Sequence, residues 1–259
     1  MSDDEIDASR APLLDHLVEL RRRLLFSLIA FAVCFGACLY VAEPIFGFLV
    51  HPLIKAGQSK VVYTQLFEAF FVQIKVALFA GAMIAFPVIA NQLWQFVAPG
   101  LYRQEKRALL PFLCATPVLF TMGAAMAYYV AIPAALHFLL SYQGKIGDIQ
   151  QEALPSVGNY LSFVMQFLFA FGFAFLTPVF LMLLESAGIV TRKQLVGARR
   201  YAIIGNFGIA LFLAPPDAGS MILLALPLCL LFELALVAIW FTERRRARDA
   251  AEGAVVRAE

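Results

Sequence analysis

Residues 69–90 read AFFVQIKVALFAGAMIAFPVIA, a stretch whose one charged side chain is that of Lys75. A helix needs about 20 mostly apolar residues to cross the hydrocarbon core of a bilayer, and this stretch supplies them. Lys75 lies about two turns from the predicted outer end, where its four-carbon stem can carry the ammonium group to the interface. The stretch is therefore expected to be a membrane-spanning helix.

Similar stretches recur along the chain. A shorter one, residues 201–214, would reach only about 21 Å as a helix, but local thinning of the bilayer can accommodate a short span. We therefore predict an all-α membrane protein with six transmembrane helices, at residues 24–42, 69–90, 109–130, 159–184, 201–214 and 221–241.

Composition points the same way. Of the 259 residues, 62% are hydrophobic and 15% are charged, against roughly 45–50% and 25% in ordinary globular domains. A mean hydropathy of +0.81 excludes cytosolic enzymes and nucleic-acid binders. We expect one membrane domain over residues 11–246 and disordered tails at 1–10 and 247–259.

The positive charges are distributed unevenly between the two sides. Arginine and lysine cluster before the first span, in the second and fourth connections and in the C-terminal tail, whereas the other connections hold only Lys55, Lys60 and Lys145. By the positive-inside rule both termini are cytoplasmic, which requires an even number of spans. The first span is too long for the apolar region of a cleavable signal peptide, so we expect it to be retained.

The segment before the first span has the pattern of an amphipathic helix. Four leucines share one stripe: Leu13, Leu17, Leu20 and Leu24. Such a helix is expected to lie on the cytoplasmic membrane surface and to hold Glu19 toward the cytoplasm. Alternatively, Glu19 only pairs with Arg22 and Arg23, at i+3 and i+4.

The second connection carries another carboxylate, Glu105. Trp94 and Tyr102 suit the aromatic belt of a membrane interface, and Pro99-Gly100 favours a turn. Glu105 opens the third span, where the helix dipole favours a negative charge, so a binding role and a purely electrostatic role are both open.

Three motifs, in order, resemble those of the TatC family, the signal-binding subunit of the twin-arginine translocase. They are His16-Leu17-Val18-Glu19-Leu20-Arg21, then Phe96-x-Ala98-Pro99-x-Leu101-Tyr102-x-x-Glu105-x-Arg107, and Pro215-Pro216-Asp217. The resemblance runs from about residue 12 to residue 241. It implies that Glu19 and Glu105 recognise the paired arginines of a signal peptide, and that Arg21 and Phe96 join this cytoplasmic site.

The resemblance also implies partners and a location. The chain would be a receptor and scaffold in the cytoplasmic (inner) membrane, exporting folded proteins with the proton motive force. Its partners would be twin-arginine signal peptides, single-span TatA/TatB-type subunits and lipid, in an oligomeric assembly without nucleic acid. No cofactor is expected, and the usual hydrolase and phosphate-loop motifs of enzymes are missing from the sequence. Cys34 and Cys38 have no histidine or carboxylate beside them, so no metal site is expected either.

Polar residues inside the spans are the remaining candidates. Glu233 either snorkels to the interface or pairs within the protein, and with Lys75 it would suit a rival function, an ion-coupled transporter of small solutes. The family commonly carries a glutamate in its fourth span where this chain has Leu176. Gln166 is the alternative polar contact there, or only bonds a neighbouring helix.

The outer connections complete the predictions. Residues 43–68 and 131–158 are expected to form helical caps on the outer face. Asp217 can cap the sixth helix, although the resemblance gives it a part in transport. We group Pro52, Gln166, Asp217 and Glu233 as candidates for partner docking or transport.

Overall fold

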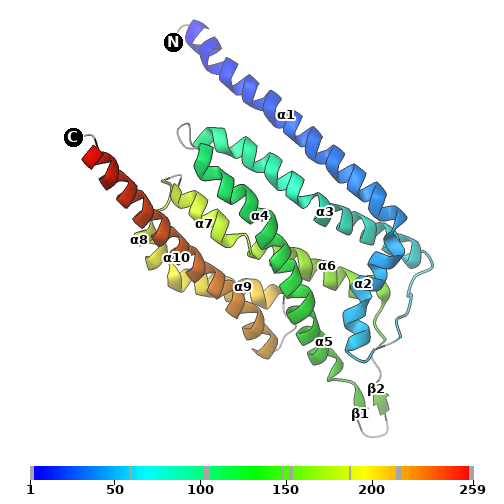
Figure 1. Ribbon diagram of the computed structural model, residues 1–259. Helices are drawn as coiled ribbons and strands as arrows, with labels where there is room; N and C mark the ends of the chain where they lie inside the picture. Colours follow the sequence, from blue (N-terminus) through cyan, green and yellow to red (C-terminus); the bar gives the residue numbers. More distant parts are fainter. Residues whose placement is uncertain are drawn as a thin grey trace. The chain divides into compact units, whose positions relative to one another are not determined.

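The computed structural model of the chain describes residues 3–58, 60–101, 106–146, 149–151, 154–186, 188–213 and 218–256 (Figure 1). Nearly all of this backbone is helical. The helices are α1 (Asp3–Tyr40), α2 (Ala42–Lys55), α3 (Glu68–Leu101), α4 (Lys106–Met126), the π-helical turn η1 (Ala127–Ala131), α5 (Ile132–Leu140), α6 (Val157–Ala174), α7 (Thr177–Ser186), α8 (Arg192–Gly197), α9 (Arg199–Leu213) and α10 (Ala218–Val256). A short antiparallel hairpin, β1 (Gly144–Ile146) and β2 (Ile149–Gln151), follows α5.

Five helical stretches of the described chain are long and apolar enough to cross a membrane. They are His16–Tyr40, Glu68–Phe96, Ala115–Leu140, Val157–Ser186 and Leu224–Arg244. They match the first four predicted spans and the sixth, so the chain is a multi-pass membrane protein. The predicted fifth span corresponds to α9, whose 15 residues reach about 22 Å. Its crossing, and the cytoplasmic position of both termini, stay predictions.

Several element boundaries differ from those expected. The amphipathic segment and the first span are one unbroken helix, α1, and its predicted position on the membrane surface stays a prediction. α1 begins at Asp3 and α10 ends at Val256, so each of these helices extends into one of the two predicted tails. The disorder predicted for the tails stays a prediction. Residues 131–140, expected as a separate cap, continue the third span through η1. The first outer connection does contain a helix, α2.

The π-helical turn and the break in the fourth span each lie beside a proline. Pro133 has no N–H to donate into the preceding turn, and the turn before it is the π-helical one. Between α6 and α7, Phe175 and Leu176 leave the helix just before Pro178, and the Thr177 hydroxyl donates to the Ala174 carbonyl at 2.6 Å. The fourth span is therefore two helices instead of one.

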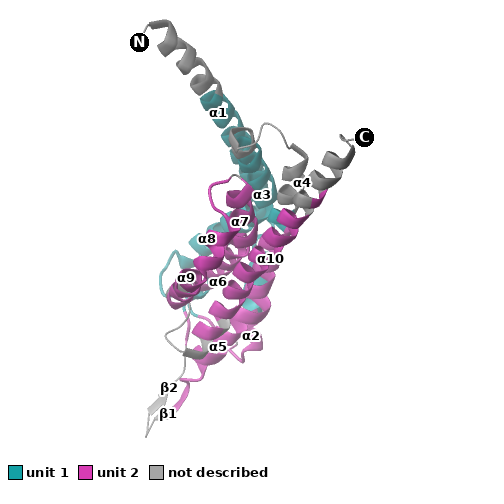
Figure 2. Ribbon diagram, turned by 90° about the vertical axis from the view of Figure 1, so that its left-hand side faces the viewer, with its two compact units in different colours: residues 1–51, 62–117, 156–161 teal, residues 52–61, 118–155, 162–259 magenta. Residues whose placement is uncertain are grey.

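The described chain forms two compact units, coloured separately in Figure 2. In the first, residues 1–51, 62–117 and 156–161, helices α1 and α3 lie side by side (Figure 1). Cys38 of α1, Ala42 of α2, and Ala77 and Ala80 of α3 form a core of small residues. A Cβ on Gly81 would lie 2.8 Å from the Cα of Phe35, so a glycine is required for this close approach.

The second unit comprises residues 52–61, 118–155 and 162–259. Here α10 packs against α7, α8 and α9. Leu195 of α8 and three residues of α10, Phe232, Leu236 and Ile239, form a buried cluster. Between α4 and α6 the contact is reciprocal: a Cβ on Gly123 would meet the Phe171 carbonyl oxygen at 2.4 Å, and one on Gly172 would meet the Phe120 ring at 2.6 Å.

Candidate functional site

Glu19 lies on α1 and forms an ion pair one turn along the same helix. The Arg23 Nε donates to Oε1 of Glu19 at 2.9 Å, and Arg23 Nη2 donates to the same oxygen. The two side chains are 20% (Arg23) and 36% (Glu19) exposed. Glu19 therefore pairs with Arg23 within its own helix, and its binding role stays a prediction. The Arg22 guanidinium instead lies 5.8 Å from the centre of the Phe26 ring.

Arg23 also connects α1 to α3. Its Nη1 donates to Oε1 of Gln95 at 2.7 Å, and Gln95 Nε2 in turn donates to Oδ1 of Asn91 at 3.0 Å. This chain of polar contacts holds the Glu19 carboxylate on the side of α1 that faces α3.

A pocket of about 300 Å³ lies beside this network. Its lining residues are Glu19, Arg22, Arg23 and Phe26 of α1 and Gln92 and Gln95 of α3. The lining contains two guanidinium groups and one carboxylate. Only Oε1 of Glu19 accepts a hydrogen bond from the residues that the structure describes; Oε2 accepts none from them.

Phe96 packs against the beginning of the His16–Arg21 motif. Its ring stacks on that of His16, with 4.3 Å between the ring centres and 21° between the planes. Two residues earlier, on another side of α3, Trp94 Nε1 donates to the Thr116 hydroxyl of α4 at 2.9 Å. These contacts fix the end of α3 between α1 and α4, directly before the second connection.

Arg21 lies on a different side of α1. It is exposed and, with Val18 and Leu25, lines a separate groove, so the structure does not bring it to the Glu19 pocket. Glu105 and Asp217 lie outside the described residues. The structure therefore leaves the predicted proximity of Glu19 and Glu105 untested.

The other described candidates lie on three different helices, α10, α6 and α2. Glu233 of α10 accepts from Arg199 Nη2 at 2.9 Å, so it pairs within the protein, one of the two outcomes considered for it. Gln166 is exposed on α6, and Leu176 lies in the break between α6 and α7. Pro52 is buried inside α2.

One carboxylate with a clear structural task was missed by the sequence analysis. Glu68 begins α3, and its Oε2 accepts from the Thr64 and Gln65 backbone N–H groups and from the Thr64 hydroxyl. Its Oε1 accepts from the Ser156 hydroxyl at 2.6 Å and the Gly158 N–H at 2.8 Å. An acid directly before residues 69–90 was the available signal, but the partners 88 and 90 positions away could not be inferred from one sequence.

The chain is similar throughout to one family of known proteins. The family model described as Sec-independent protein translocase protein (TatC) matches residues 15–227. A TatC protein of Magnetococcus marinus is 46% identical over 248 residues, covering 95% of this chain and 90% of its own length. That of Aquifex aeolicus is 41% identical, with 87% and 93% covered.

A solved structure supports the same relation. The crystal structure of a twin-arginine translocase receptor, TatC, in the detergent DDM superposes with a TM-score of 0.75 at 40% identity. The match covers 86% of this chain and 98% of that one.

Proposed function

The chain belongs to the TatC family and is a subunit of the Sec-independent, twin-arginine protein translocase, and on that premise we propose that its α1–α3 pocket recognises signal-peptide arginines. The observation that supports this most is the Glu19 carboxylate, half-buried at the pocket between α1 and α3. A carboxylate accepts a planar guanidinium through two parallel hydrogen bonds, which a lysine ammonium group cannot reproduce.

The resident arginine determines how a signal peptide can enter. Glu19 already carries the Arg23 guanidinium, and Arg22 adds a second positive charge to the pocket lining. A further cation would be repelled unless one of these charges moved away. We propose that a signal arginine replaces Arg23 on Glu19 and that the released Arg23 guanidinium turns out of the pocket.

This exchange is energetically accessible. An ion pair four residues apart on a helix contributes about 0.3–0.5 kcal/mol. Hydrogen bonds that involve a charged group contribute about 1.5–3 kcal/mol each. Arg23 makes two such bonds to Oε1 alone, so a signal arginine that uses both carboxylate oxygens replaces them without a net loss.

Two arginines call for a second carboxylate, and we propose that Glu105 supplies it. Glu105 follows Phe96 by nine positions, and the stack of Phe96 on His16 anchors the start of that connection beside α1. Arg21, on another side of α1, would act on this site indirectly.

The wider arrangement is also proposed. Both termini lie in the cytoplasm, the membrane is the inner membrane, α9 is the fifth of six spans, and the proton motive force drives export. TatA/TatB-type single-span subunits dock on this chain in an oligomeric assembly, with Pro52, Gln166, Asp217 and Glu233 as candidate contacts. Family membership replaces the rival hypothesis of a small-solute transporter, and the family is a transport component instead of an enzyme.

Site-specific crosslinking tests the pocket directly. A photoreactive residue at Gln92, which lines the pocket, should crosslink to a signal peptide with two arginines and several-fold less to the same peptide with two lysines. The Glu19→Gln variant should remove this difference, whereas Glu43→Gln, an exposed acid at the start of α2, should keep it. Equal crosslinking of both peptides to the unaltered chain would refute the proposed pocket.

A further inference from the structure

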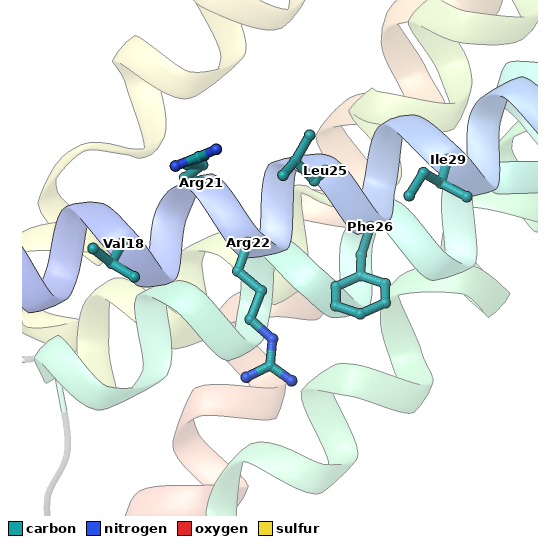
Figure 3. A pocket seen from close by; sticks show the side chains of 6 residues that line it. All are labelled: Val18, Arg21, Arg22, Leu25, Phe26 and Ile29. Atoms are coloured by element: carbon teal, nitrogen blue, oxygen red, sulfur yellow. The ribbon is translucent and has the colours of Figure 1, made fainter.

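A second groove runs along the exposed side of α1 (Figure 3). It has a volume of about 390 Å³ and is lined by Val18, Arg21, Arg22, Leu25, Phe26 and Ile29. In Figure 3, Arg21 and Leu25 follow one edge of the helix, and Arg22 and Phe26 project from the other. The lining is apolar except for the two guanidinium groups.

The apolar side chains that line the groove are exposed. Leu25 and Ile29 are 47% and 59% exposed and do not line the Glu19 pocket, whereas Arg22 and Phe26 line both the groove and that pocket. The helix is also a candidate membrane span from His16 to Tyr40. The groove therefore begins at the polar end of a span and continues into its apolar part.

Arg21 and Arg22 bring two positive charges to the polar end of the groove. Arg21 and Arg22 are exposed, and no carboxylate among the described residues forms an ion pair with either. Their neighbour Arg23 differs, because Glu19 neutralises it. An occupant of the groove should therefore carry a negative charge at this end.

The length of the groove suits a lipid chain. From Arg21 to Ile29 the groove extends about 12 Å along the helix, which is most of the roughly 15 Å half-thickness of a hydrocarbon core. We propose that the groove binds an anionic phospholipid, with the phosphate on Arg21 and Arg22 and one acyl chain along Leu25, Phe26 and Ile29. A guanidinium binds phosphate bidentately, and a net negative headgroup is attracted by both charges.

The sign of the charge separates this site from the signal pocket. The two sites share Arg22 and Phe26, but the groove has no carboxylate among its lining residues, so paired arginines would be repelled there, whereas an anionic lipid is attracted. The proposal gives Arg21 a binding partner that its position on α1 allows. It does not depend on the function proposed for Glu19.

Native mass spectrometry of the detergent-purified full chain tests the groove, with palmitoyl-oleoyl phosphatidylglycerol and phosphatidylcholine as probes. The unaltered chain should retain several-fold more phosphatidylglycerol than phosphatidylcholine. The double variant Arg21→Gln/Arg22→Gln should lose most of this preference. Lys193→Gln/Arg248→Gln removes the same charge from exposed positions elsewhere and should keep it.

Two further variants show whether a loss of lipid preference arises from misfolding of the protein. Arg21→Lys/Arg22→Lys retains the charge and should retain most of the preference, whereas Ile29→Ser should weaken retention of both lipids. Equal retention of the two lipids by the unaltered chain would overturn the proposal, as would equal losses in the arginine and control variants. Displacement of bound phosphatidylglycerol by a signal peptide in the Glu19→Gln variant would also overturn it, because the peptide would then bind in the groove itself.

Discussion

Arg23 occupies the carboxylate that the proposed function assigns to a signal arginine. It donates twice to Glu19 and once to Gln95, so it both orients the carboxylate and competes for it. The two roles have opposite consequences when the guanidinium is removed. Orientation predicts weaker signal binding, and competition predicts tighter binding.

We expect Arg23→Gln to bind a twin-arginine signal peptide about twofold more tightly, because an i,i+4 pair of about 0.3–0.5 kcal/mol no longer opposes it. Fluorescence anisotropy with a labelled peptide measures the change. Arg22→Gln is the matched control, since it removes the same charge from the pocket lining without touching Glu19. A loss of affinity in Arg23→Gln would show that orientation outweighs competition.

At the scale of the elements, Glu68 joins the start of α3 to the start of α6. Five donors from Thr64, Gln65, Ser156 and Gly158 converge on one carboxylate. Nearby, the Val157 N–H donates to the Val62 carbonyl at 3.1 Å, and the Tyr160 hydroxyl donates to the Leu49 carbonyl at 2.9 Å. The loops between these helices are therefore tied together within the first unit.

Glu68→Gln should lower the melting temperature in detergent by a few degrees, because an amide retains only one acceptor oxygen for these donors. Hydrogen exchange should accelerate at Gly158 and the first turn of α6. Glu43→Gln, which changes an exposed first-turn acid of α2, should do neither. An unchanged melting temperature and unchanged exchange would show that the Glu68 contacts do not hold these segments.

The glycine contacts between α4 and α6 give a second prediction at this scale. Gly123→Ala places a methyl group 2.4 Å from the Phe171 carbonyl oxygen, so we expect a loss of about 1–3 kcal/mol. Gly205→Ala on α9 meets nothing within 4 Å and should be neutral or slightly stabilising, since alanine favours helix. Reversible unfolding in mixed micelles compares the two, and equal effects would contradict the packing described for Gly123.

For the molecule as a whole, periodicity and length were sufficient to predict the long apolar helices and the Glu19–Arg23 pair, because both depend on neighbours within one helix. The break at Phe175 and Leu176 and the hairpin after α5 were not predicted. Hydropathy does not register a short interruption inside an apolar stretch, and a hairpin depends on pairing between strands. The Glu68 contacts were missed because they join residues far apart in the sequence.

The orientation of the chain is testable at the same scale. If both tails are cytoplasmic and α9 crosses the membrane, single cysteines in the tails and at Lys193 should resist an impermeant thiol reagent in intact cells, whereas one at Lys60 should react. The native Cys34, Cys38, Cys114 and Cys229 must first be replaced by serine or alanine. Labelling of the C-terminal tail from outside would contradict a sixth crossing and leave the five long spans.

The central claim, that Glu19 and Glu105 together bind the two signal arginines, is tested most directly by a double-mutant cycle. The dissociation constant of a twin-arginine peptide and of its twin-lysine counterpart would be measured for the unaltered chain, Glu19→Gln, Glu105→Gln and the double variant. Each single change should weaken arginine binding by about tenfold or more, as one or two charge-assisted hydrogen bonds are lost, and should largely remove the preference over lysine. Full retention of that preference in both single variants would contradict the claim.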